Sequence, residues 1–536
     1  MERRFFDFFN PDLARRMGCT EEDPFRKEGS GEDPLVTGLE YDSRKVKPGN
    51  LYFALPGLHA DGQTFIPQAV RAGARVIVLQ RPPVVREPNI FYIKVRDSRF
   101  AMSPAADAFY GSPSAHLGLV GVTGTEGKST TVYLIFQLLR LLGKRAGFIS
   151  TVQFSDGGDE QWNPEHQTTP EATALHRLLG EMRDRGAEYA VLESSSHGLS
   201  SKTNRLGDVA FDVGVMTNVT HEHLEFHGTW EQYRHDKANL FRALDRDGPG
   251  AHVKLLRREE PVRIPAFAVA NGDDPSAAYF AAATGRRTYT YSTRGAKADL
   301  AISGIESGAL GNRYTIRDAG TGRTLTAEDR LPGAFNGGNV LAAMLTLSGL
   351  LDLPAAELVP LIPRLKPVRG RMTAVLRGQP FEVLVDYAHT PSSFETIFPP
   401  LRERLGGRAG RILCLFGSAG ERDTAKRPEQ GRIASRWSDL LFLTDEDPRG
   451  EDPMGILREI AAGCAGRRPG EDLFLIPNRP EAIRKAFSLA RPGDLVLLLG
   501  KGHENSIIGA EGPVPYDEIG EAEKALAELG YCGVPV

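Results

Sequence analysis

Short apolar runs bounded by turn residues recur through the first part of the chain. Three of these runs, at 51–55, 74–79 and 90–95, have the length and the β-branched or aromatic content of strands. The segment Gly111-Ser-Pro-Ser114 then contains residues that interrupt secondary structure, and it predicts a linker. We therefore expect a first α/β domain over residues 1–112.

A second domain begins at residue 113. Residues 116–122 have the pattern of a buried strand, and they are followed by a glycine-rich turn and an apolar helix that should end near Gly143. Strand-like and helical patterns alternate from there to about residue 361, which is typical of an α/β domain with a largely parallel sheet. We expect this domain to cover residues 113–364.

The alternation starts again after a proline-containing boundary at 363–367, which predicts a Rossmann-like domain over residues 365–536. The predicted fold class is therefore α/β in three domains. The strand-like runs of this third domain are 381–388, 411–417, 439–445, 472–477 and 494–500.

The bulk composition excludes several classes of protein. With 536 residues, 41% of them hydrophobic and 25% charged, the chain is an ordinary globular mixture, and its net charge of −4 argues against general nucleic-acid binding. The cysteines form no CxxC pair, so neither a zinc site nor a disulfide framework is indicated. The N-terminus lacks the apolar core of a secretory signal, and no run of about 18 apolar residues occurs. We expect a cytoplasmic monomer without a membrane partner.

The glycine-rich turn at 121–130 predicts a phosphate site. Backbone N–H groups at a helix start can surround phosphates, Lys128 can reach the terminal ones, and Ser129 can bind Mg²⁺. The spacing is not the strict GxxxxGK[ST] pattern, so a glycine-rich turn with a solvent-facing lysine is the alternative. Glu126 must point away or be paired, because a carboxylate about 4 Å from a phosphate costs roughly 4 kcal/mol.

Acidic residues and histidines follow two later strand-like runs. Glu193 stands at a strand end, where it could hold a metal ion, and His221, His223 and His227 lie close together with acidic neighbours. Metal binding and proton transfer are both possible, and zinc stays possible although no HExxH spacing occurs. Each histidine could equally be a hydrogen-bonded structural residue.

Lys237 falls on the apolar face of a predicted helix that begins with the capping pattern Thr229-x-x-Gln232. A lysine there either extends to the surface or is desolvated. Desolvation lowers the pKa of the amine, which can then take up CO₂ as a carbamate, an oxygen ligand suited to Mg²⁺. The apolar residues of this face are Trp230, Tyr233, Leu240, Phe241 and Leu244.

Taken together, these motifs resemble the Mur ligases over nearly the whole chain, in particular the type that adds the third residue of the peptidoglycan stem peptide. Residues 42–66, which begin Asp42-Ser43-Arg44, resemble the UDP-binding motif of that type, and 124–130 resembles its ATP loop. Further segments that match the family in order are 168–170, 331–339, 370–371, 385–391, 420–428 and 500–504.

The resemblance implies roles for particular residues. It implies an ATP site formed by Gly124, Thr125, Gly127, Lys128, Ser129, Thr130, Asn336, Asn339, Arg371 and His389. It implies contacts to the UDP-muramoyl substrate from Ser43, Thr168, Thr169, Ser195 and Arg205. It implies an amino-acid site formed by Arg422, Glu446, Asp447, Arg449, Gly500 and Glu504. It implies Mg²⁺ ligation by Ser129, Glu193, His223 and carbamylated Lys237, and catalytic roles for Lys128, Lys237, Glu193, His223 and Arg371.

The activity implied is an ATP- and Mg²⁺-dependent ligation of a diamino acid to UDP-N-acetylmuramoyl-L-Ala-D-Glu through an acyl phosphate, in peptidoglycan precursor synthesis. The chain departs from the family pattern at Glu126, Arg369 and Thr373, and it has Glu446-Asp447 where the family has Asp-Asn. The carboxylate of Asp447 in place of the amide favours an amino acid whose side chain ends in an ammonium alone, such as lysine or ornithine, over diaminopimelate, which also has a carboxylate at that end. The alternative is that the change is neutral and diaminopimelate is used.

Two other functions remain open from the sequence. A folylpolyglutamate synthetase has similar ATP motifs, but the segment that begins at Asp42 argues against it. A regulatory protein that binds ATP without ligation is supported only by the departures at Glu126, Arg369 and Thr373.

Overall fold

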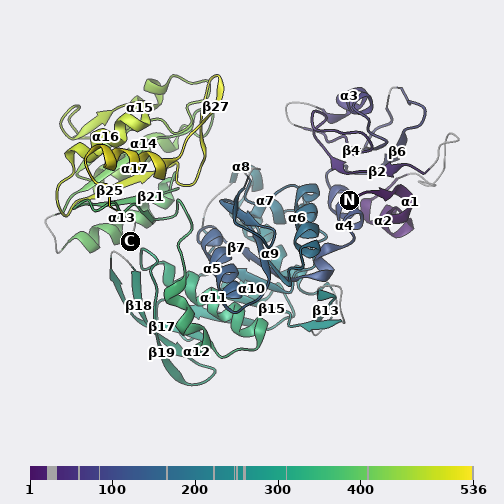
Figure 1. Cartoon of the computed structure of the whole chain (residues 1–536), viewed down its shortest axis with the longest axis horizontal. Helices are drawn as coiled ribbons and strands as arrows, with labels where there is room; N and C mark the ends of the chain where they lie inside the picture. Colours follow the sequence, from purple (N-terminus) through teal and green to yellow (C-terminus); the bar gives the residue numbers. More distant parts are fainter. Residues whose placement is uncertain are drawn as a thin grey trace. The chain divides into compact units, whose positions relative to one another are not determined.

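The computed structural model describes residues 1–20, 33–57, 61–83, 85–163, 167–220, 224–246, 248, 251–256, 261–308, 311–406 and 410–533. The chain forms two compact units, and Figure 1 labels their elements. Unit 1 comprises 1–303, 316–325 and 338–361, and unit 2 comprises 304–315, 326–337 and 362–536.

The N-terminal part of unit 1 is built on a parallel sheet in which β3 (Leu39–Glu40), β4 (Leu51–Phe53), β5 (Val76–Leu79) and β6 (Phe91–Lys94) pair in sequence order. The predicted strands are confirmed here. Helices α2 (Pro11–Met17) and α4 (Met102–Phe109) bury a core that includes Phe5, Phe53 and Phe109. The predicted linker contains Ser112 at φ 46°, and Pro113–His116 then forms a short 3₁₀ helix.

The larger sheet lies mostly in unit 1 and has the order β10-β9-β8-β11-β7-β12-β15-β16, continued by β17, β18 and β19, whose residues belong partly to unit 2. Its parallel centre places the ends of β7, β11 and β12 along one edge. The predicted strand at 116–122 is Gly118–Thr123, and the predicted helix ends at Leu141, two residues before Gly143 at φ 75°. The strands are β7 (Gly118–Thr123), β8 (Ala146–Ile149), β9 (Gln153–Ser155), β10 (Gln161–Trp162), β11 (Tyr189–Glu193), β12 (Val213–Met216), β15 (Phe267–Asn271), β16 (Thr288–Ser292), β17 (Leu300–Gly308), β18 (Gly311–Asp318) and β19 (Arg323–Glu328).

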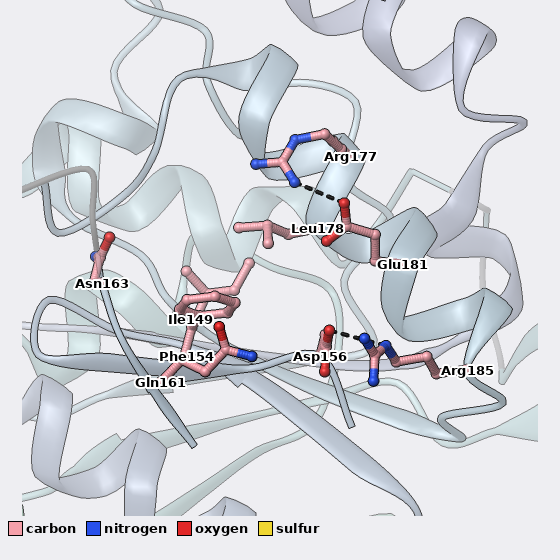
Figure 2. Close-up of a pocket in the computed structure, with 9 residues that line it drawn as sticks. All are labelled: Ile149, Phe154, Asp156, Gln161, Asn163, Arg177, Leu178, Glu181 and Arg185. Atoms are coloured by element: carbon pink, nitrogen blue, oxygen red, sulfur yellow. Dashed lines mark hydrogen bonds and ion pairs between the residues drawn. The ribbon is translucent and has the colours of Figure 1, made fainter. Parts of the chain in front are cut away.

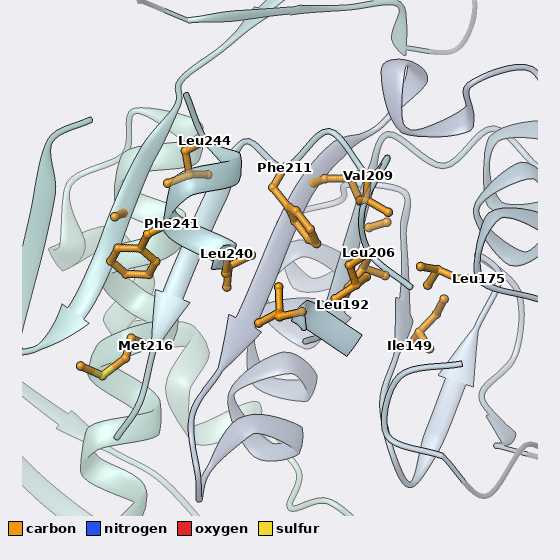
Figure 3. Packing of buried hydrophobic residues seen from close by; sticks show 14 of the residues in the cluster. Ile149, Leu175, Leu192, Leu206, Val209, Phe211, Met216, Leu240, Phe241 and Leu244 are labelled. Atoms are coloured by element: carbon orange, nitrogen blue, oxygen red, sulfur yellow. The ribbon is translucent and has the colours of Figure 1, made fainter. Parts of the chain in front are cut away.

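Helix α9 (Trp230–Ala243) packs its apolar face into the core of this sheet, as Figure 3 shows for Leu240, Phe241 and Leu244. These side chains are fully buried in one cluster with Phe211 and Met216. The amphipathic pattern of α9 is therefore confirmed. The other helices of unit 1 include α5 (Lys128–Leu141), α6 (Ala172–Asp184) and α10 (Ala277–Ala281).

Unit 2 contains a sheet in the order β20-β21-β25-β22-β23-β24, parallel except for β20 (Thr373–Ala374). Because β25 inserts between β21 and β22, the strand order reverses there, and ligands of such sheets bind beyond the carboxyl ends of the strands at that point. All of the predicted strands are found: β21 (Glu382–Asp386), β22 (Ile412–Phe416), β23 (Leu440–Leu443), β24 (Leu473–Leu475) and β25 (Leu495–Leu499). The helices of this part are α13 (Pro391–Leu405), α14 (Lys426–Trp437), α15 (Pro453–Ala461), α16 (Arg479–Leu489) and α17 (Glu518–Glu528).

Among the described residues, no single helix is long and apolar enough to cross a membrane. One pair, α11 (Asn336–Leu351) and the segment Ala355–Arg364, reaches the length and composition together but is bent by 119°. Leu341, Met344 and Leu347 of α11 are buried, as in the core helix of a globular domain.

Candidate functional site

The loop between β7 and α5 fits closely around its glycines. A Cβ on Gly124, at φ 151°, would lie 1.9 Å from Thr217 Oγ1, and one on Gly127, at φ 82°, would lie 2.5 Å from Asn339 Oδ1. Only glycine satisfies both the backbone angles and the space. Asn218 also fixes the loop, since its backbone carbonyl accepts a hydrogen bond from Thr125 N–H at 2.8 Å.

Lys128 and Glu126 take different positions at this loop. Lys128 Nζ donates to the Thr125 carbonyl at 2.7 Å, so the amine folds over the loop and does not extend into solvent. Glu126 is exposed, and its N–H donates to Asn218 Oδ1 at 2.8 Å while its carbonyl accepts from Thr217 Oγ1 at 2.6 Å. The loop is thus held through the main chain of Glu126.

Glu193 closes β11 and touches the start of α5. One of its carboxylate oxygens, Oε2, accepts hydrogen bonds from Ser129 Oγ and from Thr151 N–H, both at 2.8 Å, and the residue is 2% exposed. A hydroxyl beside a buried carboxylate is a donor set that suits a hard cation such as Mg²⁺. His223, the third predicted ligand, lies outside the described residues, and no group of three or more His, Cys, Asp or Glu able to hold a metal is found within them.

Lys237 is 1% exposed, so the interpretation that it extends to the surface is wrong. Its Nζ donates to the Gly124 carbonyl of the phosphate loop and lies 4.5 Å from the centre of the Tyr233 ring. The helix start is only partly as predicted: Thr229 accepts from Gln232 N–H at 3.1 Å, but the Gln232 side chain donates to Asp236.

The predicted muramoyl-substrate residues of the central domain form one hydrogen-bonded group beside Glu193. Thr169 Oγ1 donates to the Glu193 carbonyl at 2.8 Å and accepts from the N–H of Ser195 at 3.0 Å. Arg205 donates to the Thr169 carbonyl at 2.8 Å, and Thr168 Oγ1 lies 3.1 Å from Thr151 Oγ1. Ser43 lies apart from this group, beside α3 (Ile66–Arg71), with its hydroxyl 3.2 Å from Gln68 Oε1.

A cavity of about 370 Å³ lies between the β9–β10 hairpin and α6 (Figure 2). It contains no predicted site residue, and the ion pairs Arg177–Glu181 and Arg185–Asp156 line it. Asn163 lines this cavity. Its side chain donates hydrogen bonds to the carbonyls of Ser150 at 2.8 Å and Gln167 at 3.0 Å, the residues that precede Thr151 and Thr168. Its lining residues are Ile149, Phe154, Asp156, Gln161, Asn163, Arg177, Leu178, Glu181 and Arg185.

In unit 2, Asp386 at the end of β21 fixes the segment that contains Gly370 and Arg371. Its two oxygens accept from the N–H groups of Met372 at 2.7 Å and Ala388 at 2.8 Å. Burial raises the pKa of Asp386, and the nearby Arg371 opposes this shift. The Arg371 guanidinium lies 4.7 Å from the centre of the Tyr387 ring, which therefore holds the guanidinium in place.

His389 and Arg422, two further predicted residues of this unit, have different environments. The His389 ring nitrogen Nδ1 lies 2.9 Å from the Tyr387 carbonyl, and the His389 carbonyl accepts from Lys426 Nζ at 3.0 Å. Arg422 is exposed to solvent. In the segment 331–339, which is predicted to contact the nucleotide, the Asn336 side chain donates to the Pro332 carbonyl at 2.9 Å, and Thr131 donates to Asn339 at 3.1 Å.

Asp447 is already paired within the protein. Lys501 is fully buried, and its Nζ donates to Asp447 Oδ1 at 2.8 Å and to Glu504. Ile508 N–H also donates to Asp447 Oδ1, at 2.9 Å. Asp447 is therefore held within the protein by Lys501, a pairing that the sequence analysis did not consider.

Three buried polar atoms that follow the carboxyl ends of β22 and β23 have no hydrogen-bond partner among the residues that the structure describes. They are Glu446 Oε2, Arg449 Nε and Ser418 Oγ. Gly500 lies beside the first of them, since a Cβ there would be 3.1 Å from Glu446 Oε2. Buried polar atoms are rarely left unsatisfied, so this group has the character of a ligand site.

The family profiles decide the assignment. The profile described as "Mur ligase middle domain" matches residues 122–347, "Mur ligase, glutamate ligase domain" matches 370–502, and "Mur ligase family, catalytic domain" matches 35–110. The chain belongs to the Mur ligase family. The predicted family, the α/β fold and the enzyme class of ATP-dependent amide ligase are thus confirmed.

Individual relatives of this Mur ligase are similar over almost their full length. A UDP-N-acetylmuramyl-tripeptide synthetase from Treponema denticola is 50% identical, over 92% of this chain and 94% of the relative. A UDP-N-acetylmuramoyl-L-alanyl-D-glutamate–2,6-diaminopimelate ligase from Geobacillus kaustophilus is 39% identical, over 93% and 96%. A solved structure of an enzyme with the latter name is 26% identical, with a TM-score of 0.62 over 96% of this chain and 99% of that one.

Sequence reasoning missed several residues that shape the site of this Mur ligase. Lys501 and Tyr387 lie inside the motifs at 500–504 and 385–391, so those motifs could have indicated them. Thr151, which binds Glu193, carries no local signal, because this partner lies 42 positions away in the sequence. Asn163 binds backbone carbonyls, which no residue type in the sequence marks.

Proposed function

We propose that this Mur ligase adds a diamino acid to UDP-N-acetylmuramoyl-L-Ala-D-Glu with hydrolysis of ATP to ADP and phosphate. The observation that carries the proposal is the 50% identity to a UDP-N-acetylmuramyl-tripeptide synthetase over 92% of the chain. The glycine-fitted loop beside Glu193 and the unsatisfied polar atoms of unit 2 supply the matching sites for phosphates and for an amino acid.

The loop residues Gly124, Thr125, Gly127 and Thr130 surround the ATP phosphates, with the N–H groups of α5 facing them. Lys128 exchanges its bond to the Thr125 carbonyl for the terminal phosphates. Ser129, Glu193, His223 and carbamylated Lys237 are the proposed ligands of Mg²⁺, which would neutralise phosphate charge when bound. Asn336, Asn339, Arg371 and His389 complete the nucleotide contacts.

The reaction has two steps. A free carboxylate oxygen of the substrate's D-glutamate attacks the γ-phosphorus of ATP, so that the bond to ADP breaks and an acyl phosphate forms. The amine of the incoming amino acid then attacks the acyl carbon, and phosphate leaves. Thr168, Thr169, Ser195 and Arg205 hold the muramoyl peptide for the first step, and Ser43 contributes to the UDP end.

The amino-acid site is assigned to Arg422, Glu446, Asp447, Arg449, Gly500 and Glu504. Within it, Glu446 is the carboxylate proposed to bind a substrate ammonium, because its buried Oε2 has no hydrogen-bond partner among the described residues, whereas Asp447 and Glu504 share Lys501. A buried carboxylate attracts an ammonium and repels a carboxylate at the far end of the incoming amino acid. A diamino acid without a distal carboxylate, such as lysine or ornithine, is therefore preferred.

The second candidate substrate is meso-diaminopimelate. It is favoured by Arg449, whose buried Nε lacks a partner among the described residues and could bind a distal carboxylate. The diaminopimelate ligase of Geobacillus kaustophilus is a relative that bears this name.

We place the domain boundaries at residues 112 and 364. These positions fall in the intervals between the matched ranges 35–110, 122–347 and 370–502. A monomeric state and the absence of nucleic-acid and membrane partners stay predictions.

Phosphate release with single components omitted tests the function. Release should require ATP, Mg²⁺, UDP-N-acetylmuramoyl-dipeptide and a diamino acid together. Equal release with a folate and glutamate would identify a different ligase, and nucleotide binding without amino-acid-dependent release would point to a regulatory protein.

A further inference from the structure

A single buried carboxylate collects several hydrogen bonds just before the segment 331–336. Asp329 is 6% exposed and follows β19. Its Oδ1 accepts from Asn312 N–H, Asn312 Nδ2 and Leu331 N–H, each at 3.0 Å, and its Oδ2 accepts from the Tyr314 hydroxyl. Burial raises the pKa of Asp329, and these hydrogen bonds oppose the shift.

Asn312, at the start of β18, extends the same contacts into the loop. Besides Asp329, its Nδ2 donates to the carbonyls of Leu331 at 2.8 Å and Gly333 at 3.3 Å. Ser307 Oγ donates to Asn312 Oδ1 at 2.6 Å, which orients the carboxamide. Asn312 therefore holds the loop at two carbonyls and, through Asp329, at one N–H.

Hydrogen bonds within the loop also hold its shape. Gly333 has φ 93°, Asn336 N–H donates to the Gly333 carbonyl at 3.1 Å, and the Asn336 side chain donates to the Pro332 carbonyl. The Asn336 side chain thus binds the carbonyl of Pro332, and Asn312 binds the carbonyls of its two neighbours, Leu331 and Gly333. A shift of Leu331 or Gly333 would move the Asn336 side chain with it.

We propose that Asn312 and Asp329 are positioning residues that hold the segment 331–336 in its nucleotide-binding shape. This inference rests on the proposed role of Asn336 in ATP binding. Neither residue is among the proposed ligand contacts, so their loss should weaken ATP binding without an equal effect on the muramoyl substrate or the amino acid.

Asn312→Ala, Ser307→Ala and a matched control, Asp318→Asn, test this assignment. Asp318 is a similarly buried carboxylate of the β18–β19 hairpin, and it binds Gly320 N–H and Thr321 rather than the loop. We expect Asn312→Ala to raise the KM for ATP and the Kd for ADP about tenfold, with kcat and the KM for UDP-N-acetylmuramoyl-dipeptide within about twofold of wild type. Ser307→Ala should raise the same two constants about threefold, and Asp318→Asn should change neither.

Equal effects on all substrates, or an ADP affinity in Asn312→Ala that matches the control, would overturn the assignment. If Asn312→Ala fails to fold by circular dichroism, Ser307→Ala decides the question by the same constants. ADP binding is measured by calorimetry and needs no ligation. An unchanged ADP affinity in Asn312→Ala would therefore overturn the assignment even if wild-type turnover supports the proposed function. A reduced ADP affinity would support the assignment even if the wild type showed no turnover.

Discussion

The glycine-rich loop of unit 1 and the region around Glu446 in unit 2, which are the proposed nucleotide and amino-acid sites, differ in how far the protein satisfies its own polar groups. In the loop, Lys128 binds a carbonyl of its own turn, Ser129 binds Glu193, and Lys237 binds Gly124. In unit 2, Glu446 and Arg449 each keep a buried atom that has no partner among the described residues.

This difference indicates two modes of binding. The loop is held by its own hydrogen bonds, so a bound phosphate would exchange them for stronger charged ones. The region around Glu446 has buried polar atoms without hydrogen-bond partners among the described residues, so its specificity would depend on which charges a ligand brings. Substitutions should therefore affect turnover in unit 1 and amino-acid choice in unit 2.

The largest effect is expected for Lys128→Ala. The variant loses the amine that we assign to the terminal phosphates, and kcat should fall about 10³-fold or more. Lys144→Ala, just beyond the other end of α5, is the control and should retain activity. A phosphate-release assay measures both, and a Lys128→Ala enzyme with activity near that of the control would show that the amine does not act on phosphate.

Lys237→Ala should lower activity about 10²-fold, because the proposed carbamate would no longer bind Mg²⁺. A small carboxylate such as acetate should restore part of the activity by occupying the space of the carbamate, whereas chloride at equal ionic strength should not. Near-normal activity of Lys237→Ala without acetate would show that a carbamate on Lys237 is not needed for the reaction.

Glu446→Gln should change amino-acid choice more than Asp447→Asn. Loss of the Glu446 charge should reduce the use of lysine and ornithine about tenfold relative to diaminopimelate, while Asp447→Asn acts mainly on the internal pair with Lys501. Competition among equal concentrations of the three amino acids, read by the mass of the UDP-tripeptide, measures the ratio. An exclusive diaminopimelate product from the wild type would refute the preference.

The smallest effect concerns stability. Burial raises the pKa of Asp445 to about 6, with Arg479 opposing. Because the folded pKa exceeds the unfolded value, stability falls as pH rises from about 4 to about 6 and stays lower above that range. Asp445→Asn should thus stabilise the protein by about 1–2 kcal/mol at pH 7 and by little near pH 4, in denaturant unfolding at both pH values. Equal stabilisation at both would contradict the shift.

Local patterns predicted the elements better than the contacts between them. The strands and the glycine-rich loop follow from runs of neighbouring residues, whereas the apolar positions of α9 left open whether Lys237 extends to the surface or is buried, as it is in the structure. The pair Asp447–Lys501 joins residues 54 positions apart, and Asn312 meets Asp329 across a hairpin, so no short window contains both partners. Arg427 and Arg479 are fully buried, although arginine is usually exposed, because glutamates elsewhere in the chain pair with them.

The transfer of a carboxylate oxygen from substrate to phosphate would show directly whether an acyl phosphate forms. UDP-N-acetylmuramoyl-L-Ala-D-Glu labelled with ¹⁸O in its D-glutamate carboxylates would be incubated with ATP, Mg²⁺ and a diamino acid, and the released phosphate analysed by mass. An acyl phosphate intermediate predicts one ¹⁸O atom in the phosphate for each UDP-tripeptide formed. If unlabelled phosphate accompanied formation of the UDP-tripeptide, the reaction would not pass through an acyl phosphate.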